Sequence, residues 1–301
     1  MNVDEIIIGT ISYKNIPALV IDFKGSVLEC FNVDGLIGSN LLRLGALQID
    51  WAKQKVILTN TYKRLKLKKA DGSNLLINKV QSSPYLTVNI NSTITDRLLI
   101  DTGSDDFYTF SKKGLEYVQS KGYLLNDVKY ESQGSGFIGL FGPDTVGSNK
   151  LVKMDSITIG KMAHLHEFYT VTTNDDQSRI GSLLLKQGLT TIDFKKGLFF
   201  FSLYSDNFQY TYISFGFVII NADNNLLVGS VWKNSEAYEK GIRVGDKIVD
   251  IDGLNVGKLT ICELFFKFRE FVESKEAITV SIRKPGCDDV KKIELTRLNL
   301  D

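Results

Sequence analysis

The chain contains an internal repeat, and this constrains its fold more than any other feature of the sequence. Residues 36–42 resemble residues 179–185, an offset of 179 − 36 = 143, and the similarity continues into residues 45–51 and 188–194. A repeat of this kind marks two copies of one structural unit. We therefore expect the two segments to fold alike.

A second pair of segments extends the repeat towards the N-terminus. Val3–Gly9 resembles Met154–Gly160, an offset of 160 − 9 = 151, and each segment alternates like a strand that ends at a glycine turn. In contrast, residues 77–153 of the second copy have no counterpart in the first. We expect the first copy to be incomplete, so that the chain is shortened or takes its partner half from another molecule.

Length and composition set limits on the architecture and on the partners. The 301 residues suit two modules rather than one, and 43% hydrophobic with 24% charged residues predicts folded cores. The 36 Lys and Arg nearly cancel the 35 Asp and Glu, which argues against a nucleic-acid partner. No apolar run reaches the roughly 18 to 20 residues of a membrane span. The first residues lack the features of a signal peptide and read as a strand.

The cysteines and histidines show no metal-binding pattern. Cys30, Cys262 and Cys287 are scattered without a CxxC spacing, which predicts neither a zinc site nor a disulfide framework, and favours buried free thiols. His164 and His166 alternate on a predicted strand and lack an HExxH motif. We expect no metal and no other cofactor.

One short motif suggests catalysis. Asp101-Thr102-Gly103-Ser104 follows the apolar residues 98–100. Aspartic proteolysis uses two adjacent carboxylates that share one proton, so that one is a base towards water and the other an acid. The threonine can offer a hydroxyl, and the glycine permits a sharp turn and offers its amide to the carboxylate. The tripeptide alone is also an ordinary turn sequence. A Ser-His-Asp triad is the weaker alternative, because no GxSxG motif is present.

Other sequence features support a catalytic role for this motif. An apolar strand, Asp-Thr-Gly-Ser, a glycine-rich segment and a later Ile180-Gly181 before a pair of leucines together resemble the retropepsin family of aspartic proteases. The resemblance covers residues 77 to about 203, and its later half recurs in residues 1–60. It implies a mainly β fold with a closed barrel built from two repeats, and Asp101 as a catalytic carboxylate. The pairs Ile180-Gly181 and Ile37-Gly38 would support the catalytic loop from beneath.

The glycine-rich segment matches the flap of these enzymes in position. The resemblance assigns it Gly134, Ser135, Gly136, Phe137 and Gly139, while a flexible surface loop is the alternative. Two further aspartates follow the catalytic motif, as they do in retroviral members. Ser182 stands where those members carry an arginine, so we assign Asp105 and Asp106 no role in substrate binding.

The C-terminal part has a different character. Residues 234–253, with a short helix, a Gly-Asp pair and a strand that ends at Asp-Gly, are similar to a PDZ domain, and the resemblance covers residues 212–298. Apolar residues between 261 and 272 recur at helical spacing. The resemblance implies a β-barrel-like sandwich with two helices, in which Phe215, Gly216 and Phe217 receive the carboxylate of a C-terminal peptide. The alternative is a PDZ domain that packs and binds no free peptide.

These observations predict a domain order and a function. We expect the end of a first repeat in residues 1–62, a linker in 63–76, a second repeat in 77–205 and a PDZ domain in 210–301. The predicted function is an aspartic endopeptidase that acts on polypeptides, with a homodimer as one way to pair two Asp101 residues. The alternative is an inactive scaffold that binds peptides through the PDZ domain. The resemblance to bacterial proteins with both modules leans towards the periplasm, the envelope or secretion.

Overall fold

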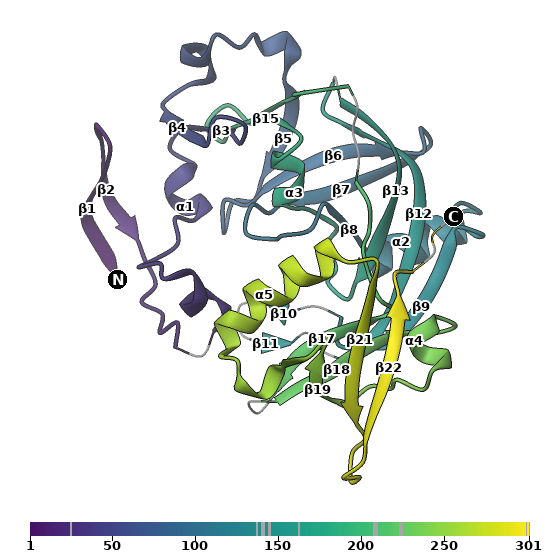
Figure 1. Cartoon of the computed structure of the whole chain (residues 1–301). Coiled ribbons are helices and arrows are strands. Elements are labelled where there is room, and N and C mark those ends of the chain that lie inside the picture. Colours follow the sequence, from purple (N-terminus) through teal and green to yellow (C-terminus); the bar gives the residue numbers. More distant parts are fainter. Residues whose placement is uncertain are drawn as a thin grey trace. The chain divides into compact units, whose positions relative to one another are not determined.

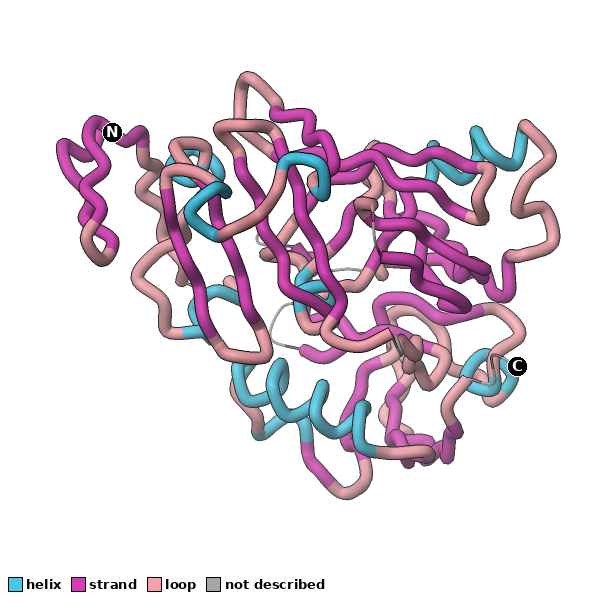
Figure 2. Tube along the Cα trace, turned by 90° about the horizontal axis from the view of Figure 1, so that it is seen from above, coloured by secondary structure: helices cyan, strands magenta, loops and turns pink. Residues whose placement is uncertain are grey.

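The computed structural model of the protein describes residues 1–24, 26–136, 138–139, 142–143, 146–161, 163–206, 210–222, 225–298 and 300. The chain is 46% strand and 15% helix and includes a closed barrel of six strands, which confirms the predicted fold class as mainly β (Figure 2). It separates into two compact units. Unit 1 comprises Met1–Asp22, Gly35–Leu124 and Lys153–Tyr210, and unit 2 comprises Phe23–Asp34, Leu125–Val152 and Thr211–Asp301.

Unit 1 consists of strands and short helices, which Figure 1 labels. Its elements are β1 (Asn2–Ile8), β2 (Ile11–Pro17), α1 (Ser39–Leu42), β3 (Ala46–Asp50), β4 (Lys55–Thr59), 3-10 turns at Tyr62–Leu65 and Lys69–Asp71, β5 (Ser73–Ile77), β6 (Pro84–Ile90), β7 (Ile94–Ile100), β8 (Tyr108–Ser111), α2 (Lys112–Ser120), β13 (Ala163–Thr173), β14 (Arg179–Ile180), α3 (Ser182–Leu185), β15 (Gly188–Asp193) and β16 (Leu198–Leu203). The long β12 (Gly147–Ile159) has residues in both units.

The six-stranded barrel lies in unit 1. β6 pairs with β7, β7 with β14, β14 with β8, and β8 with β13, and β12 closes the barrel onto β6. Burial alternates along β6, where Leu86, Val88 and Ile90 are buried and the residues between them are more exposed. This period of two places one face of each strand in the barrel core.

A second sheet of unit 1 joins the two copies of the repeat. Its strand order is β4-β3-β15-β16-β5, with every pair antiparallel. Residues 73–76 of the predicted linker belong to β5. The domain boundaries themselves stay a prediction.

The strand register shows that the repeat is also a symmetry. In the first copy Ala46 pairs with Thr59, and in the second Leu189 pairs with Ser202, where 46 + 143 = 189 and 59 + 143 = 202. Where the copies meet, Gln48 pairs with Thr191, and 48 + 143 = 191. A residue that pairs with its own counterpart lies on a two-fold axis, so the two copies are related by an internal two-fold between β3 and β15.

Unit 2 is built around an antiparallel sheet that includes β17, β18, β19, β21 and β22, and one long helix, α5 (Figure 1). Its elements are a 3-10 helix at Val27–Phe31, β9 (Val128–Gly134), β10 (Ile138–Gly139), β11 (Gly142–Pro143), β17 (Phe217–Ala222), β18 (Asn225–Trp232), α4 (Glu236–Glu239), β19 (Lys247–Ile251), β20 (Leu254–Asn255), a 3-10 turn at Val256–Lys258, α5 (Ile261–Ser274), β21 (Ala277–Arg283) and β22 (Val290–Thr296). Its buried core includes Val228, Ile248, Val280 and Ile282.

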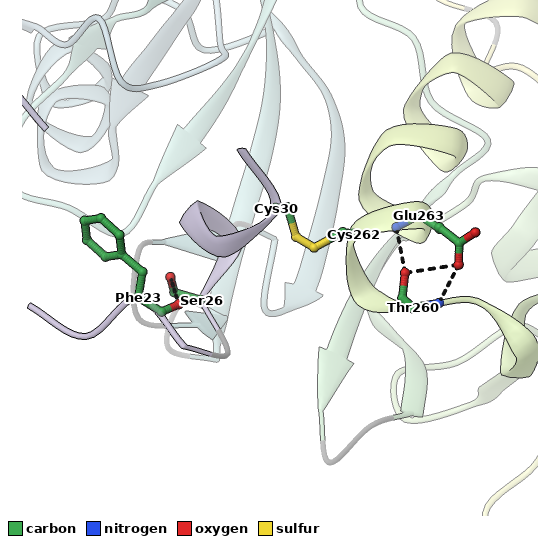
Figure 3. Close-up of a disulfide and its surroundings, with 6 residues drawn as sticks. All are labelled: Phe23, Ser26, Cys30, Thr260, Cys262 and Glu263. Atoms are coloured by element: carbon green, nitrogen blue, oxygen red, sulfur yellow. Dashed lines mark hydrogen bonds between the residues drawn. A yellow bond between two sulfur atoms is a disulfide. The ribbon is translucent and has the colours of Figure 1, made fainter. Parts of the chain in front are cut away.

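The cysteines correct the sequence prediction. Cys30 and Cys262 form a disulfide across 232 residues of chain, and Cys287 is free but exposed, so the prediction of three buried thiols was wrong. Figure 3 shows that the bridge links the 3-10 helix Val27–Phe31 to the first turn of α5. Phe31 also packs edge-to-face on Phe266, with ring centroids 5.5 Å apart. Such a distant pairing leaves no local spacing pattern in the sequence.

Candidate active site

Asp101 lies at the end of a buried barrel strand. β7 runs parallel to β14, with Leu99 opposite Arg179 and Ile100 opposite Ile180. The amide of Asp101 donates a hydrogen bond of 2.9 Å to the carbonyl of Ile180, so the neighbouring strand fixes the backbone where β7 ends. Asp101 itself is half-buried. Its carboxylate therefore lies where the paired strands β7 and β14 end, with access to solvent.

Two backbone amides hold Asp101 in place, one through its carboxylate and one through its carbonyl. The amide of Gly103 donates to Oδ1 of Asp101 at 3.1 Å, and the amide of Ser104 donates to the Asp101 carbonyl at 3.2 Å. A hydrogen bond from a backbone amide fixes the orientation of a carboxylate. Thr102 is exposed. The turn thus presents Asp101 as an oriented acceptor.

Gly181 fits tightly against the Asp101 loop. A Cβ atom on Gly181 would stand 2.2 Å from the carbonyl oxygen of Asp106 and 2.9 Å from that of Ser104, so no larger residue fits there without a shift. The amide of Gly181 donates to the carbonyl of Phe107 at 3.1 Å, and the amide of Ser182 donates to the carbonyl of Ser104 at 2.8 Å. The start of α3 therefore holds the loop of residues 104–107 in position.

The matching pair in the first copy has a different environment. Gly38 precedes α1 as Gly181 precedes α3, but a Cβ on Gly38 would meet only Oδ1 of Asn40, at 3.0 Å. Ile37 is 57% exposed, whereas Ile180 is 1% exposed. Among the contacts of the residues that the structure describes, Asp101, Gly103, Ser104, Ile180 and Gly181 come together, and Ile37 and Gly38 do not join them.

A hydrogen-bonded pair next to the motif was missed by the sequence analysis. The hydroxyl of Tyr108, on β8, donates to Oδ2 of Asp96, on β7, at 2.8 Å. Burial, followed by the charge of Asp96 and this hydrogen bond, raises the pKa of Tyr108 well above its usual value. The two residues lie on either side of the Asp-Thr-Gly motif in the sequence, on two strands that both pair with β14, and no local sequence pattern indicated that they meet.

The glycine-rich segment belongs to unit 2, where glycines allow close strand packing. Gly134 has φ +127° and ends β9, which pairs with β18, and a Cβ on it would stand 2.0 Å from the carbonyl oxygen of Gly229. The amide of Ser135 donates to that same carbonyl at 2.9 Å. A Cβ on Gly136 would lie 2.5 Å from Nδ2 of Asn149. The base of the predicted flap is therefore part of the sheet that contains β18.

The tip of the same segment is only partly described. Gly139, in β10, pairs with Gly142 of β11, which makes a short hairpin. Phe137 lies outside the described residues. The predicted role of this segment as a flap stays a prediction.

The predicted carboxylate-binding loop of unit 2 is closely packed. Phe215 and Phe217 are buried, and Gly216 has φ +90°, where a Cβ would stand 2.7 Å from Oγ of Ser235. The amide of Gly216 donates to Oγ of Ser214 at 3.1 Å, and its carbonyl accepts from the amide of Trp232 at 2.9 Å. The loop leads directly into β17 and is held rigidly by the chain itself.

No metal centre or membrane helix is found in the described part of the chain. No group of three or more His, Cys, Asp or Glu could hold a metal ion there. His164 and His166 are exposed on β13, and Nδ1 of His164 is 3.0 Å from the hydroxyl of Thr158. Among the same residues, no helix is both long enough and apolar enough to cross a membrane.

Comparison with known proteins finds solved structures that are similar to part of this chain. The chain is similar to a retropepsin-like aspartic protease from Rickettsia conorii, with 20% sequence identity and a TM-score of 0.30. The match covers 45% of this chain and 96% of that one. No family model matches the chain, and no curated protein matches it. The case for an activity therefore rests on the residues of this chain.

Proposed function

We propose that the chain provides one half of an aspartic endopeptidase site, with Asp101 as one of its two catalytic carboxylates. The main support for this proposal is the fixed position of the loop that follows Asp101. The Gly103 amide fixes the Asp101 carboxylate, and Gly181 packs against the carbonyls of the loop. A carboxylate that is oriented at a strand end and open to solvent can activate a water molecule. Polypeptides in extended conformation are the proposed substrates.

The reaction needs a second carboxylate beside the first. Two carboxyl groups within hydrogen-bond distance share one proton, because like charges so close together cannot both be ionised. The ionised member then takes a proton from water, and the protonated member gives one to the substrate carbonyl. The sequence has one Asp-Thr-Gly, so Asp101 alone has no such partner. A homodimer that pairs two Asp101 residues is one way to supply it.

Cleavage of a peptide mixture at mildly acid pH, with and without pepstatin, tests the role of Asp101. The Asp101→Asn variant should lose all pepstatin-sensitive cleavage, because an amide cannot act as a base. The Asp155→Asn variant is the matched control, since Asp155 is an exposed carboxylate of β12. Equal cleavage by wild type and Asp101→Asn would exclude Asp101. Absence of cleavage in every variant would favour the inactive peptide-binding scaffold.

We further propose that residues 210–301 are a PDZ domain that recognises C-terminal peptides. The support is the glycine of left-handed backbone conformation at the entrance to β17, followed by the β17–β18 hairpin and α5. A peptide would add to the edge of the sheet as a further strand, with its carboxylate at the loop of Phe215, Gly216 and Phe217. Fluorescence anisotropy with one peptide as a free acid and as an amide tests this. Equal affinity of the two forms would contradict carboxylate recognition.

An oxidising compartment is the proposed location, in the periplasm, the cell envelope or outside the cell. The Cys30–Cys262 disulfide supports this proposal, because cysteines in reducing compartments are kept as free thiols. Mass spectrometry of alkylated protein, purified from cell fractions without added reductant, would test the proposal. Finding both cysteines alkylated in the native host would contradict it.

A further inference from the structure

Three polar side chains of unit 2 form one row across three neighbouring strands. Ser132 on β9 pairs directly with Asn149 on β12 and, on its other side, with Trp232 on β18. The side chains of directly opposed residues in antiparallel strands point to the same face of a sheet. Ser132 therefore has Asn149 and Trp232 as its cross-strand neighbours on that face. We call these three residues the Ser132 row.

Each side chain of the Ser132 row is buried and has a polar atom without a partner. Ser132 and Asn149 are each 1% exposed, and Trp232 is 2% exposed. Among the described residues, no group hydrogen-bonds to Oγ of Ser132, to Oδ1 of Asn149 or to Nε1 of Trp232. A buried polar group without a hydrogen bond loses its hydration and gains nothing in return, so most buried polar groups have a partner. Three adjacent exceptions call for one common explanation.

The Ser132 row carries no charge. On the opposite face of the same strands, the side chains of Lys150 and Glu131 form an ion pair of 3.7 Å, and Gln133 is exposed. An ion bound at the row would therefore be buried without an opposite charge from the row itself, which is unfavourable. The row favours a small neutral ligand that both donates and accepts hydrogen bonds.

The three unpaired atoms match the hydrogen bonds of water. Nε1 of Trp232 can only donate, Oδ1 of Asn149 can only accept, and the hydroxyl of Ser132 can do both. We propose that the Ser132 row is a binding site for buried water. Bound water accepts a hydrogen bond from Trp232, donates one to Asn149 and bonds to Ser132 between them. Buried water molecules make about three such bonds to groups that otherwise lack a partner.

Small residues border the Ser132 row and leave room for water. The next row on the same face consists of Gly134 on β9, Gly147 on β12 and Ser230 on β18. Gly136 gives space to the amide of Asn149, since a Cβ on Gly136 would stand 2.5 Å from Nδ2 of Asn149. Glycine and serine fill little of the space beside the row, and the polar atoms that line it favour water there.

Bound water would complete the attachment of β9 to its two neighbours. Backbone pairs join β9 to β12 and to β18, but the three polar atoms of the row make no direct hydrogen bond across the strands. A water molecule that bridges two protein groups is nearly as favourable in enthalpy as a direct hydrogen bond. The site uses neither Asp101 nor the loop of residues 215–217, so its test is independent of the proposed function.

Nuclear magnetic resonance of the full chain tests the proposal, because the protein has only two tryptophans, Trp51 and Trp232. In a perdeuterated chain labelled with nitrogen-15, the Trp51→Phe variant assigns the two indole signals. We expect a nuclear Overhauser cross-peak between the indole proton of Trp232 and water, with the sign of a water molecule that tumbles with the protein. Trp51, which is 49% exposed, is the control in bulk water and should show none. Absence of the cross-peak at Trp232 would overturn the proposal.

Two variants separate bound water from the hydroxyl of Ser132, whose proton exchanges with water and gives the same kind of cross-peak. Ser132→Ala should keep the cross-peak, because Trp232 and Asn149 still hold water, and its loss would overturn the proposal. The double variant Ser132→Ala/Asn149→Leu should lose it, because one remaining partner does not hold a buried water. An undiminished cross-peak in the folded double variant would also contradict the site. Gln133→Leu, on the exposed face of β9, is the matched control and should leave the cross-peak unchanged.

A crystal structure of the full chain provides a measurement that needs no variant. We expect electron density for water at hydrogen-bond distance, about 2.7 to 3.2 Å, from at least two of the three atoms of the Ser132 row. Density that shows another side chain in that place, a direct hydrogen bond between members of the row, or no water at all would overturn the proposal.

Discussion

The side-chain amide of Gln48 donates a hydrogen bond of 2.9 Å to the hydroxyl of Thr191, and these two residues occupy the same position in the two copies of the repeat. Both side chains are buried. The pair lies where β3 meets β15, on the internal two-fold of unit 1. A polar contact at this place ties the copies together and fixes the register in which their strands pair, because a slip of one residue would separate the two groups.

The Gln48–Thr191 bond should therefore contribute measurably to stability. We expect Gln48→Met and Thr191→Val, which keep the volumes nearly unchanged, each to lower the free energy of unfolding by about 1 kcal/mol or more. A double-mutant cycle in urea should give a coupling energy of about 1 kcal/mol, because both single variants break the same bond. Strictly additive effects would mean that the two groups do not interact.

Gly181 and Gly38 provide a matched pair of substitutions. Gly181→Ala should destabilise the protein by about 3 kcal/mol, because the new methyl group would overlap the carbonyls that hold the Asp101 loop. Gly38→Ala, at the equivalent place of the first copy, should cost under about 1 kcal/mol. Thermal unfolding of both variants checks the difference. Equal losses would show that the loop does not press on Gly181.

The sequence predicted the repeat because apolar positions and glycines of residues 36–51 recur 143 residues later. Gly45 and Gly188 illustrate this: a Cβ on either would stand within 2.5 Å of the carbonyl oxygen of Thr59 or Ser202, which are themselves counterparts. A larger residue does not fit at either position without a shift, so both copies carry glycine there and the repeat is visible in the sequence. The place of Asp101 after a strand was equally visible, since the apolar residues 98–100 come directly before it, and β7 does end at Ile100.

Other features were out of reach because they depend on contacts between distant segments. The glycine-rich segment around Gly134 gave no sign that β9 adds to β18, since strand pairing of residues almost a hundred positions apart leaves no local pattern. The exposure of Ile37 was equally hidden, because its sequence matches that of the buried Ile180. What differs is the loop that covers one and not the other.

The disulfide should be a major stabilising element of unit 2. The double variant Cys30→Ser/Cys262→Ser should lose several kcal/mol, up to about 5 kcal/mol, because the bridge restricts a loop of 232 residues in the unfolded chain. A dithiol reductant should lower the unfolding midpoint of the wild type and leave that of the double variant unchanged. Cys287→Ser, at the exposed free thiol, is the control. An unchanged wild-type midpoint after complete reduction would contradict the prediction.

Tyr108 should make the stability of the protein depend on alkaline pH. Its folded-state pKa is raised well above the usual value, by burial first and then by Asp96, so the neutral hydroxyl is favoured in the folded state. For a raised pKa the contribution to stability is complete below the unfolded pKa of about 10 and is lost as the pH rises through the folded value. Wild-type stability should therefore fall more steeply above pH of about 10 than that of Tyr108→Phe.

At neutral pH the wild type should be more stable than Tyr108→Phe, although the wild type loses more stability as the pH rises. Tyr108→Phe should be less stable than wild type by about 1 to 3 kcal/mol, because it removes the hydrogen bond of 2.8 Å to the carboxylate of Asp96. The two urea-unfolding curves, measured from neutral pH to about pH 11, should thus converge. Tyr117→Phe, at a tyrosine that is 65% exposed, should run parallel to wild type throughout. If the curves of Tyr108→Phe and wild type ran parallel up to about pH 11, Tyr108 would ionise as easily in the fold as in the unfolded chain, and the predicted alkaline effect would be wrong.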